Sequence, residues 1–432
     1  MIKIVEHNSE SSKKLIRKLE LRSQFENEPI LITVREILAD VRKTGDNAVI
    51  KYTRKFDAPD MPLQHLQVSD QEIDLAYSKV EDNFLDAIRL AKSNIEKFHR
   101  KQLRNSWITT ETNGTILGHL IRPLHRVGVC VPSVSQLLVS SLIMNVVPAK
   151  VAGVEEIAVF MGPKADGTID RHMLTTAAEC GTREIYKCGG AQAIAAMAYG
   201  TNTIAKVDKA VGPGNLYVQI AKKEVHGLID IDKIAGPSEV LVIADEHANP
   251  SHIAADLISQ AEHGEDSSAI LVTTSKEIAQ KVESQITSQI ANLPRQKEIT
   301  GAFENHGVAF VVENLDQAIS LATHIAPEHL ELDVAEPWQW LGKIRNAGAI
   351  MIGKFTPESV GDYIAGPNHI LPTGGTAKYA SPLSVDDFIK KTSLIHYTKT
   401  ALKEVTPAVT KLADVEGLKG HAAAMEVRFD TD

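Results

Sequence analysis

The chain has 432 residues, of which 43% are hydrophobic and 23% charged, and its formal net charge is −9 at pH 7. A chain of this length exceeds one ordinary hydrophobic core, and the composition predicts a soluble globular protein with two or three domains. The acidic balance disfavours a nucleic-acid or anionic-membrane partner, because basic surfaces bind phosphate groups, and no apolar run is long enough to span a bilayer.

The N-terminal residues 1–25 predict a polar helix that is too small to fold alone. They lack the apolar stretch and the small-residue cleavage site of a secretory signal. The three cysteines, Cys130, Cys180 and Cys188, have no CxxC spacing and cannot build a disulfide framework. A reducing, cytoplasmic compartment is therefore expected.

The pattern from about residue 29 to 105 is helical, with Gly45 as a break. A strand is expected at 122–131, closed by Pro132. Apolar strands then alternate with helices, an order that indicates right-handed βαβ units and mostly parallel sheets. Further strands are expected at residues 155–161, 182–188 and 205–211 and in SEVLVIAD, SSAILVTT, GVAFVVE, HLELDV and GAIMIG.

This order predicts an α/β fold with two incomplete Rossmann-like lobes of parallel sheet, a helical N-terminal arm and an extended helical C-terminal tail. We expect the arm at 1–25, a discontinuous first α/β domain at 26–129 with 237–382, a second α/β domain at 130–236, and the tail at 383–432. No GxGxxG motif follows any of these strands, and VGPGN at 211–215 is too short for a Rossmann fingerprint.

The stretch 231–264 leads through a strand into a helix that ends near Gln260, Glu262 and His263. Residues three apart on a helix share a face, so the Gln260 amide and the His263 imidazole are expected together. Such oxygen and nitrogen donors suit zinc. The alternative is an exposed histidine at a helix C-terminus before Gly264, favoured by the helix dipole. The absence of HExxH argues against a zincin.

Glu328 and His329 follow Pro327 at a loop-to-strand junction in APEHLEL. An adjacent carboxylate and imidazole suit general acid–base chemistry, because histidine titrates near neutrality and glutamate can activate water. The side chain of His329 alternates with apolar Leu330. A solvated strand edge is therefore the alternative interpretation.

The loop 359–375, SVGDYIAGPNHILPTGG, carries Asp362 and His369 among glycines and prolines that fix its turns. Composition leaves open whether it is a functional or a buried connecting loop. Glu416 and His421 lie on a polar helix and have the pattern of surface residues. The thiol of Cys130 or Cys188 is a candidate nucleophile for aldehyde oxidation, although apolar strands favour inert thiols.

Several motifs, in the expected order over roughly residues 30–428, resemble the histidinol dehydrogenase family. The resemblance implies an NAD-dependent zinc enzyme that oxidises L-histidinol through L-histidinal to L-histidine, the last steps of histidine biosynthesis. The motifs are IDKIAGPSEVLVIADEHANPSHIAADLISQAEHG, APEHLEL, GDYIAGPNHILPTGG, SPLSVDDFIKK, CGGAQAIAAMAYGT and VDKAVGPGN.

The resemblance also implies residue roles, with most of the zinc site in the first domain and NAD on the side of the second. Glu328 and His329 would be the catalytic acid–base pair, and one Zn²⁺ per subunit is expected. The implied zinc ligands are Gln260, His263, Asp362 and His421. These ligands would hold substrate together with Ser238, His329, His369 and Glu416, and the implied NAD contacts are Gln192 and Asn215.

The resemblance further implies a homodimer whose C-terminal tail crosses to the partner, so that Glu416 and His421 would complete the partner's site. One segment departs from the family. Where the family usually has tyrosine followed by Val-Pro-Gly-Gly, this chain has Cys130-Val131-Pro132-Ser133-Val134. Loss of the two glycines removes close backbone approach, so a reshaped loop or weaker NAD binding is expected here.

Three other functions compete with this one. A related zinc and NAD dehydrogenase could oxidise another polar alcohol, such as a sulfonated propanediol, but His369 and Glu416 favour a substrate with an amine and an imidazole. A zinc hydrolase would use Glu328 and water and reduce no NAD. A non-catalytic paralogue would have lost NAD binding at 130–134, and an idle site has no need for Glu328 and His329.

Overall fold

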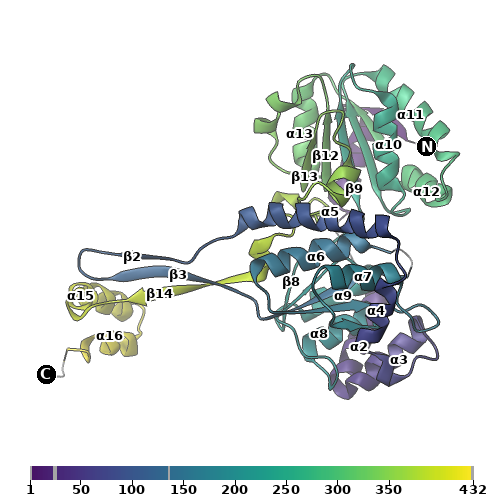
Figure 1. Ribbon diagram of the computed structural model, residues 1–432. Helices are drawn as coiled ribbons and strands as arrows, with labels where there is room; N and C mark the ends of the chain where they lie inside the picture. The colour runs from purple at the N-terminus through teal and green to yellow at the C-terminus, as the bar shows by residue number, and fades with distance from the viewer. Residues whose placement is uncertain (1, 23–26, 135–136, 430–432) are drawn as a thin grey trace. The chain divides into compact units, whose positions relative to one another are not determined.

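The structure is a computed structural model that describes residues 2–22, 27–134 and 137–429 (Figure 1). The chain divides into two compact units. Unit 1 comprises Met1–Gln102 and Leu124–Phe388, and unit 2 comprises Leu103–Pro123 and Ile389–Asp432. Unit 1 contains two parallel sheets with helices on both faces, which confirms the predicted α/β fold. None of the helices in the described ranges has the length and apolarity that a bilayer span requires.

The first sheet of unit 1 has six parallel strands in the order β1-β11-β10-β9-β12-β13. Its central strands are apolar and buried along their whole length, as expected where helices cover both faces of a parallel sheet. The strands are β1 (Lys3–Glu6), β9 (Glu239–Ala244), β10 (Ser268–Thr273), β11 (Val308–Val311), β12 (His329–Asp333) and β13 (Ala349–Ile352).

Helices cover both faces of this sheet, and each face has its own hydrophobic core. One core contains α10 (Pro250–Ala261), α11 (Lys276–Ile290) and α12 (Gln296–His306). The other contains α1 (Glu10–Glu20) and α13 (Leu315–Ile325). The short helix α14 (Glu358–Tyr363) follows β13.

The N-terminal arm is not wholly helical, which corrects the prediction for residues 1–25. Lys3–Glu6 form β1, which pairs in parallel with β11 at the sheet edge, and the helix α1 begins only at Glu10. A four-residue edge strand of sequence KIVE has no period of its own. Its conformation comes from a partner strand about three hundred residues away in the chain, which local sequence does not reveal.

The second sheet of unit 1 has five parallel strands in the order β6-β5-β4-β7-β8. Because the strands are parallel, the loops that follow β4, β5 and β7 all lie at the same end of the sheet, the carboxyl end. The strands are β4 (Arg126–Val131), β5 (Glu156–Met161), β6 (Ile185–Tyr186), β7 (Lys209–Val211) and β8 (Asp230–Ile231).

The helices of residues 28–99 pack with this second sheet, whereas we expected residues 26–129 to form one domain with 237–382. Amphipathic periodicity identifies the apolar face of a helix but not the sheet that receives it. One core joins α2 (Glu28–Thr44) and α3 (Asp46–Phe56) with α8 (Gly190–Tyr199) and α9 (Leu216–Val225). The other joins α4 (Asp70–Tyr77) and α5 (Asp82–His99) with α6 (Val139–Ala152) and α7 (Arg171–Glu179). Short 3-10 helices lie at Leu63–His65, Arg100–Gln102, Pro337–Gln339, Leu341–Lys343, Thr376–Lys378 and Val385–Phe388.

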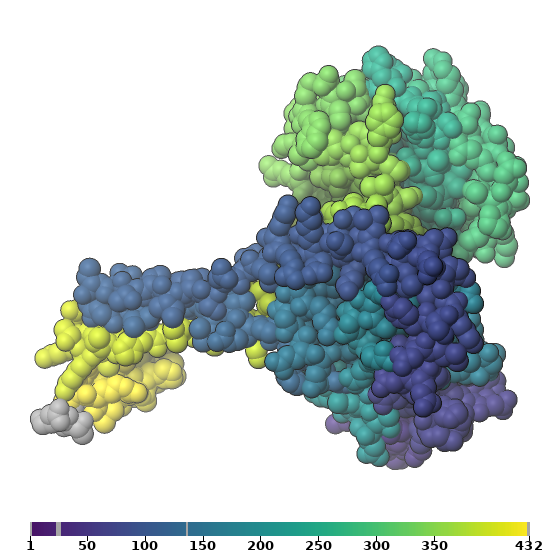
Figure 2. Space-filling model, viewed as in Figure 1, coloured from purple at the N-terminus to yellow at the C-terminus, as the bar shows by residue number. Residues whose placement is uncertain are grey.

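Unit 2 is a three-stranded antiparallel sheet followed by two helices, so the predicted tail is not entirely helical. The strand β14 (Ile389–His396) pairs along its full length with β3 (Ile116–Pro123), which also pairs with β2 (Trp107–Thr110). Figure 2 shows the β2–β3 hairpin alongside the C-terminal segment. The helices are α15 (Lys399–Val415) and α16 (Lys419–Glu426). Most residues of β14 are exposed, so it lacks the apolar alternation that predicts a strand.

Candidate active site

The predicted acid–base pair lies at the amino edge of the six-stranded sheet, that is, at the end of the sheet where its parallel strands begin. His329 is the first residue of β12, and Glu328 precedes it. The neighbouring parallel strand β9 begins at Glu239, directly after Ser238, and His329 is in register with Val240. Two segments that are about ninety residues apart in the chain therefore meet at one sheet edge.

Glu328 is buried, and its carboxylate accepts a hydrogen bond of 2.8 Å from the backbone N–H of Glu239. Burial raises the pKa of Glu328 to about 8, although the His329 imidazole and the Glu239 N–H group act in the opposite direction. A carboxyl group that titrates near neutrality can both take and return a proton at physiological pH.

The imidazole of His329 is buried and oriented by the backbone of Glu239. Its Nδ1 lies 3.0 Å from the Glu239 carbonyl oxygen, which assigns the ring proton to Nδ1. Nε2 is 3.3 Å from Oδ1 of Asp362. Burial alone lowers the pKa of His329, but the carboxylates of Glu358, Glu328 and Asp362 outweigh it and raise this pKa. The burial of the pair excludes the alternative of a solvated strand edge.

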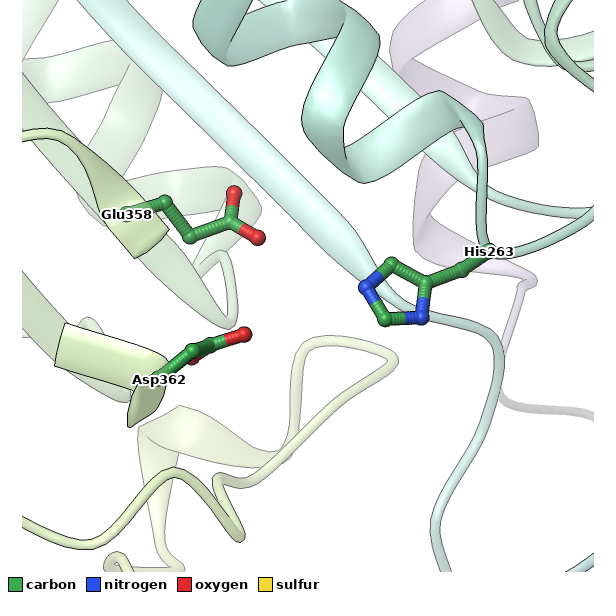
Figure 3. A group of neighbouring side chains, drawn as sticks. All are labelled: His263, Glu358 and Asp362. Carbon is green, nitrogen blue, oxygen red and sulfur yellow. The ribbon is translucent and has the colours of Figure 1, made fainter. Parts of the chain in front are cut away.

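Three side chains converge beside this pair (Figure 3). His263 follows α10, while Glu358 and Asp362 both project from α14, and one ligand atom of each residue lies within 4.8 Å of the others. Carboxylate oxygen and imidazole nitrogen are the donors that zinc accepts in proteins. The donor chemistry of this group therefore fits the implied metal. Two of its members, His263 and Asp362, were expected from the sequence.

Glu358 was not expected from the sequence. It stands four residues before Asp362, and this spacing places both carboxylates on one face of a helix. That spacing is the feature of the sequence from which Glu358 could have been identified as a site residue. Glu358 is buried, and burial raises its pKa to about 8, while the His329 imidazole opposes this shift. An unpaired buried carboxylate is costly, so a charged or donor partner is required here.

Gln260 lies in the last turn of α10 and is buried against Glu358. Its amide satisfies both neighbours when the nitrogen donates to Glu358, at 3.0 Å from Oε2, and the oxygen accepts from the Glu239 N–H, at 2.7 Å. The amide oxygen and the His263 side chain, which is exposed, come from the same helix end, as the spacing predicted.

The loop that carries His369 is mostly buried from residue 368 to 374, whereas Tyr363 is exposed. Burial opposes ionisation of Asp362, but its hydrogen bond to His329 and the neighbouring His369 outweigh this and lower the pKa of Asp362. His369 Nδ1 lies 2.8 Å from the carbonyl oxygen of Asp362, and Nε2 lies 3.1 Å from Oγ of Ser141. Burial lowers the pKa of His369. Both ring nitrogens thus have protein partners.

The remaining predicted substrate residues have different environments. Ser238 is half-buried directly before β9, and its carbonyl oxygen accepts a hydrogen bond from the N–H of Ser268. Glu416 caps the end of α15, and His421 lies in α16. Both side chains are exposed within unit 2.

The predicted NAD residues lie around the carboxyl ends of the five-stranded sheet. The chain crosses from one side of this sheet to the other between β4 and β7, and α/β proteins bind ligands at such a switch point. Gly212, after β7, has φ +112°, and a Cβ there would lie 2.1 Å from the carbonyl oxygen of Cys130. Only glycine fits so close a contact.

Both predicted NAD contacts lie at the N-terminal ends of helices at the carboxyl end of this sheet. Gln192 is buried in the first turn of α8. The side chain of Asn215 caps α9 by accepting a hydrogen bond of 3.2 Å from the N–H of Val218. In the segment that departs from the family, the hydroxyl of Ser133 donates to the carbonyl oxygen of Gly162, at 2.6 Å. Burial raises the pKa of Cys130 to about 12, so its thiol is not an activated nucleophile.

The chain is similar to known proteins over nearly its whole length. A family model described as histidinol dehydrogenase matches residues 20–429. The histidinol dehydrogenase of Clostridium acetobutylicum is 49% identical over 429 residues, which cover 99% of each chain. That of Halalkalibacterium halodurans is 50% identical, over 92% of this chain and 94% of the relative. A crystal structure of histidinol dehydrogenase from Elizabethkingia anophelis is 39% identical, with a TM-score of 0.93, over 100% of this chain and 98% of that one. The family resemblance expected from the motifs is confirmed.

Proposed function

The chain belongs to the histidinol dehydrogenase family, and on this premise we propose that it oxidises L-histidinol through L-histidinal to L-histidine. Membership makes it an oxidoreductase of histidine biosynthesis. The observation that carries the two-step reaction is the buried pair Glu328 and His329, hydrogen-bonded to one residue, Glu239, beside a group of metal-binding donors.

His329 is the proposed base for both oxidations. Its Nδ1 is held by the Glu239 carbonyl oxygen, which leaves Nε2 to take the hydroxyl proton of histidinol. After Nε2 has released this proton to solvent, the same nitrogen takes a proton from the hydrated aldehyde in the second oxidation. NAD, when bound, supplies the hydride acceptor for each oxidation.

Glu328 is the proposed group that activates water for attack on the aldehyde. The Glu239 N–H holds one of its oxygens, so the carboxyl group has a fixed direction. A pKa of about 8 allows it to exchange a proton with water at neutral pH. Retention of the aldehyde until it is hydrated protects a reactive compound.

Gln260, His263 and Asp362 are the proposed zinc ligands of this subunit, with Glu358 oriented toward the same point as His263 and Asp362. Coordination by Gln260 would turn its amide so that the oxygen, in place of the nitrogen, faces Glu358. Zinc would orient the amine and imidazole nitrogens of the substrate by direct coordination. A dication at Glu358 and Asp362 would also cancel the negative charge that raises the His329 pKa, and a neutral imidazole can accept a proton.

The fourth ligand, His421, and the substrate contact Glu416 are proposed to come from the tail of a partner subunit. Unit 2 supports a homodimer because its own surface leaves large apolar side chains exposed, and such patches mark interaction surfaces. These side chains are Ile395, Leu412, Val415, Leu418 and Val427.

NAD is proposed to bind at the carboxyl edge of the five-stranded sheet, with Gln192 and Asn215 as contacts. The close approach of Gly212 to Cys130 and the helix start at Asn215 support this placement. The segment Cys130–Val134 still lies at that edge, so we expect NAD binding to persist. A cytoplasmic location stays a prediction, supported by three free, buried thiols.

The test is the stoichiometry of NADH formation by the full chain with L-histidinol, zinc and excess NAD. Two NADH per histidinol support both oxidations. One NADH per histidinol contradicts the role of Glu328. NADH from a sulfonated propanediol but not from histidinol moves the assignment to another polar alcohol, and hydrolysis of an acyl compound without NADH moves it to a hydrolase.

The His329→Asn variant supplies the matched control for this assay. Asn keeps a polar side chain at the start of β12 but cannot act as a base at neutral pH. We expect an unchanged fold by circular dichroism and no measurable alcohol oxidation. Near-normal turnover in this variant would be incompatible with the proposed base.

A further inference from the structure

Glu239 contacts both members of the proposed acid–base pair and Gln260 at the end of the six-stranded sheet where its strands begin. Its N–H donates to Glu328 at 2.8 Å, and its carbonyl oxygen accepts from Nδ1 of His329 at 3.0 Å. The same N–H faces the amide oxygen of Gln260. The N–H and the carbonyl group of Glu239 belong to two successive peptide units, so a displacement of this one residue would move Glu328 and His329 together.

The side chain of Glu239 is fixed at both oxygens. Oε1 accepts from Nε of Arg22 at 2.5 Å and from the N–H of Gly374 at 3.0 Å, and Oε2 accepts from Nη2 of Arg22 at 3.0 Å. This is a two-point contact between guanidinium and carboxylate, which fixes direction as well as distance. The Glu239 side chain is only 3% exposed and the Arg22 side chain 12%.

Arg22 also holds the chain that leads into Glu328. Its Nη2 donates to the carbonyl oxygen of Ile325, the last residue of α13, at 2.9 Å. The next residue, Ala326, has φ +53° and is the non-glycine residue with positive φ in the described parts of the chain. Such a backbone conformation is strained and persists only where its surroundings hold it. Pro327 and the catalytic pair follow directly.

We infer that Arg22 is a positioning residue for the acid–base pair, acting through Glu239 and through the end of α13. This inference rests on the proposed function of Glu328 and His329. One guanidinium, supplied by the segment after α1, joins the two strand starts whose relative placement sets the distance between base, carboxyl group and substrate. Lysine has one donor nitrogen and cannot reproduce both the two-point contact with Glu239 and the contact with the carbonyl oxygen of Ile325.

The experiment compares Arg22→Ala, Arg22→Lys and Glu239→Gln with wild type in the full chain with zinc. Steady-state kinetics are measured with L-histidinol and, separately, with L-histidinal. Because a displacement of about 1 Å at reacting groups can cost about 100-fold in rate, we expect Arg22→Ala to lower kcat between about 10-fold and 100-fold. The KM for histidinol should change less than about 3-fold, since the substrate contacts remain.

Conservative variants separate positioning from mere stabilisation. Glu239→Gln keeps an oxygen for the Gly374 N–H, and Arg22→Lys keeps one donor to the carboxylate, so each should retain more kcat than Arg22→Ala. They also decide the question if Arg22→Ala fails to fold. Equal kcat in wild type, Arg22→Lys and Arg22→Ala, or a loss confined to KM, would overturn the inference.

Arg126→Ala is the matched control. The side chain of Arg126 is also buried and contacts two carboxylates, those of Glu156 and Glu184, which are more exposed than Glu239; this contact lies at the amino end of β4 in the other sheet. We expect a lower melting temperature and an unchanged kcat per folded molecule. If Arg126→Ala loses as much kcat as Arg22→Ala at the same melting temperature, the effect is general destabilisation and the inference is wrong. If the wild type forms no NADH, the proposed function fails and the inference fails with it. If the wild type forms NADH normally and the Arg22 variants have the same kcat as the wild type, only the inference is overturned.

Discussion

Lys222 of α9 forms a buried ion pair with Asp232, which follows β8. We expect removal of this pair to have a larger effect than removal of any other buried contact on the carboxyl end of the five-stranded sheet, where NAD is proposed to bind. Both side chains are 1% exposed. Lys222 Nζ donates to the carbonyl oxygen of Gly212 at 3.1 Å, and Asp232 accepts from the N–H of Gly212 at 2.9 Å. The pair therefore holds both backbone groups of the turn that approaches Cys130.

We expect Lys222→Met to destabilise the protein by about 3–5 kcal/mol, because it leaves the Asp232 carboxylate buried without its counter-charge. Met preserves most of the apolar length, so loss of packing adds little. The lost hydrogen bond to Gly212 contributes about 1 kcal/mol of this total. For a cooperative unit of about 150–250 residues, each kcal/mol lowers the melting temperature by roughly 2–4 °C.

A double substitution tests the mechanism of this loss. Lys222→Met combined with Asp232→Asn removes both charges and keeps an acceptor for the Gly212 N–H, so most of the stability should return. Thermal and denaturant unfolding, followed by circular dichroism, measure the free energy of unfolding, and fluorescence titration measures NAD affinity. Lys222→Met should bind NAD more weakly and histidinol with unchanged affinity.

The control is Arg35→Met, which removes an exposed ion pair to Glu224 on the same helix α9. Solvent screens this pair, so the unfolding midpoint should not change. A cost below about 1 kcal/mol for Lys222→Met, or a double variant as unstable as the sum of the two single variants, would refute the argument from uncompensated buried charge.

Further outcomes follow from other groups. Glu328→Gln should slow aldehyde oxidation more than alcohol oxidation, because only the former needs activated water; equal losses in single-turnover assays would contradict that role. Burial raises the pKa of Asp57 from its ordinary value of 3.8 to about 6, so between about pH 4 and 6 the unfolded chain releases this proton while the folded chain keeps it, and the folded state loses stability as the pH rises. Asp57→Asn should therefore raise the melting temperature above pH 6 and have little effect below pH 4, and a gain independent of pH would count against this explanation. The thiols of Cys130, Cys180 and Cys188 are buried with raised pKa values, so iodoacetamide should leave the native enzyme active and label all three only after unfolding; rapid inactivation at neutral pH would show that one thiol is reactive.

The sequence identified the parts of the site that have a local signal. The apolar runs of β9 and β12 predicted buried parallel strands, and APEHLEL placed Glu328 and His329 at a strand start. Helical spacing placed Gln260 and His263 together at the end of α10. Each of these predictions needs only the period of one element and the residue types at its end.

What the sequence did not reveal depends on partners far away in the chain. The strand β1 exists because β11 accepts it, and β14 because β3 does, although neither sequence alternates clearly. Glu358 becomes a candidate metal ligand only because tertiary packing places α14 opposite the end of α10, next to His263. Arg22 stands in a polar segment with many charged neighbours, and its burial against Glu239 is decided by tertiary packing.

The two sheets of unit 1 are proposed to bind charges of opposite sign at opposite strand ends, and helix polarity gives the reason. Helices α8 and α9 begin at the carboxyl edge of the five-stranded sheet, where their N–H groups carry partial positive charge that suits the NAD phosphates. Helices α10 and α13 end at the amino edge of the six-stranded sheet, where carbonyl groups carry partial negative charge that suits a cation. The side chains of His263 and Gln260 at the end of α10 therefore offer a cation ligands at a point where the helix dipole also favours positive charge. Exchange of NAD and metal between these two edges would oppose both helix dipoles.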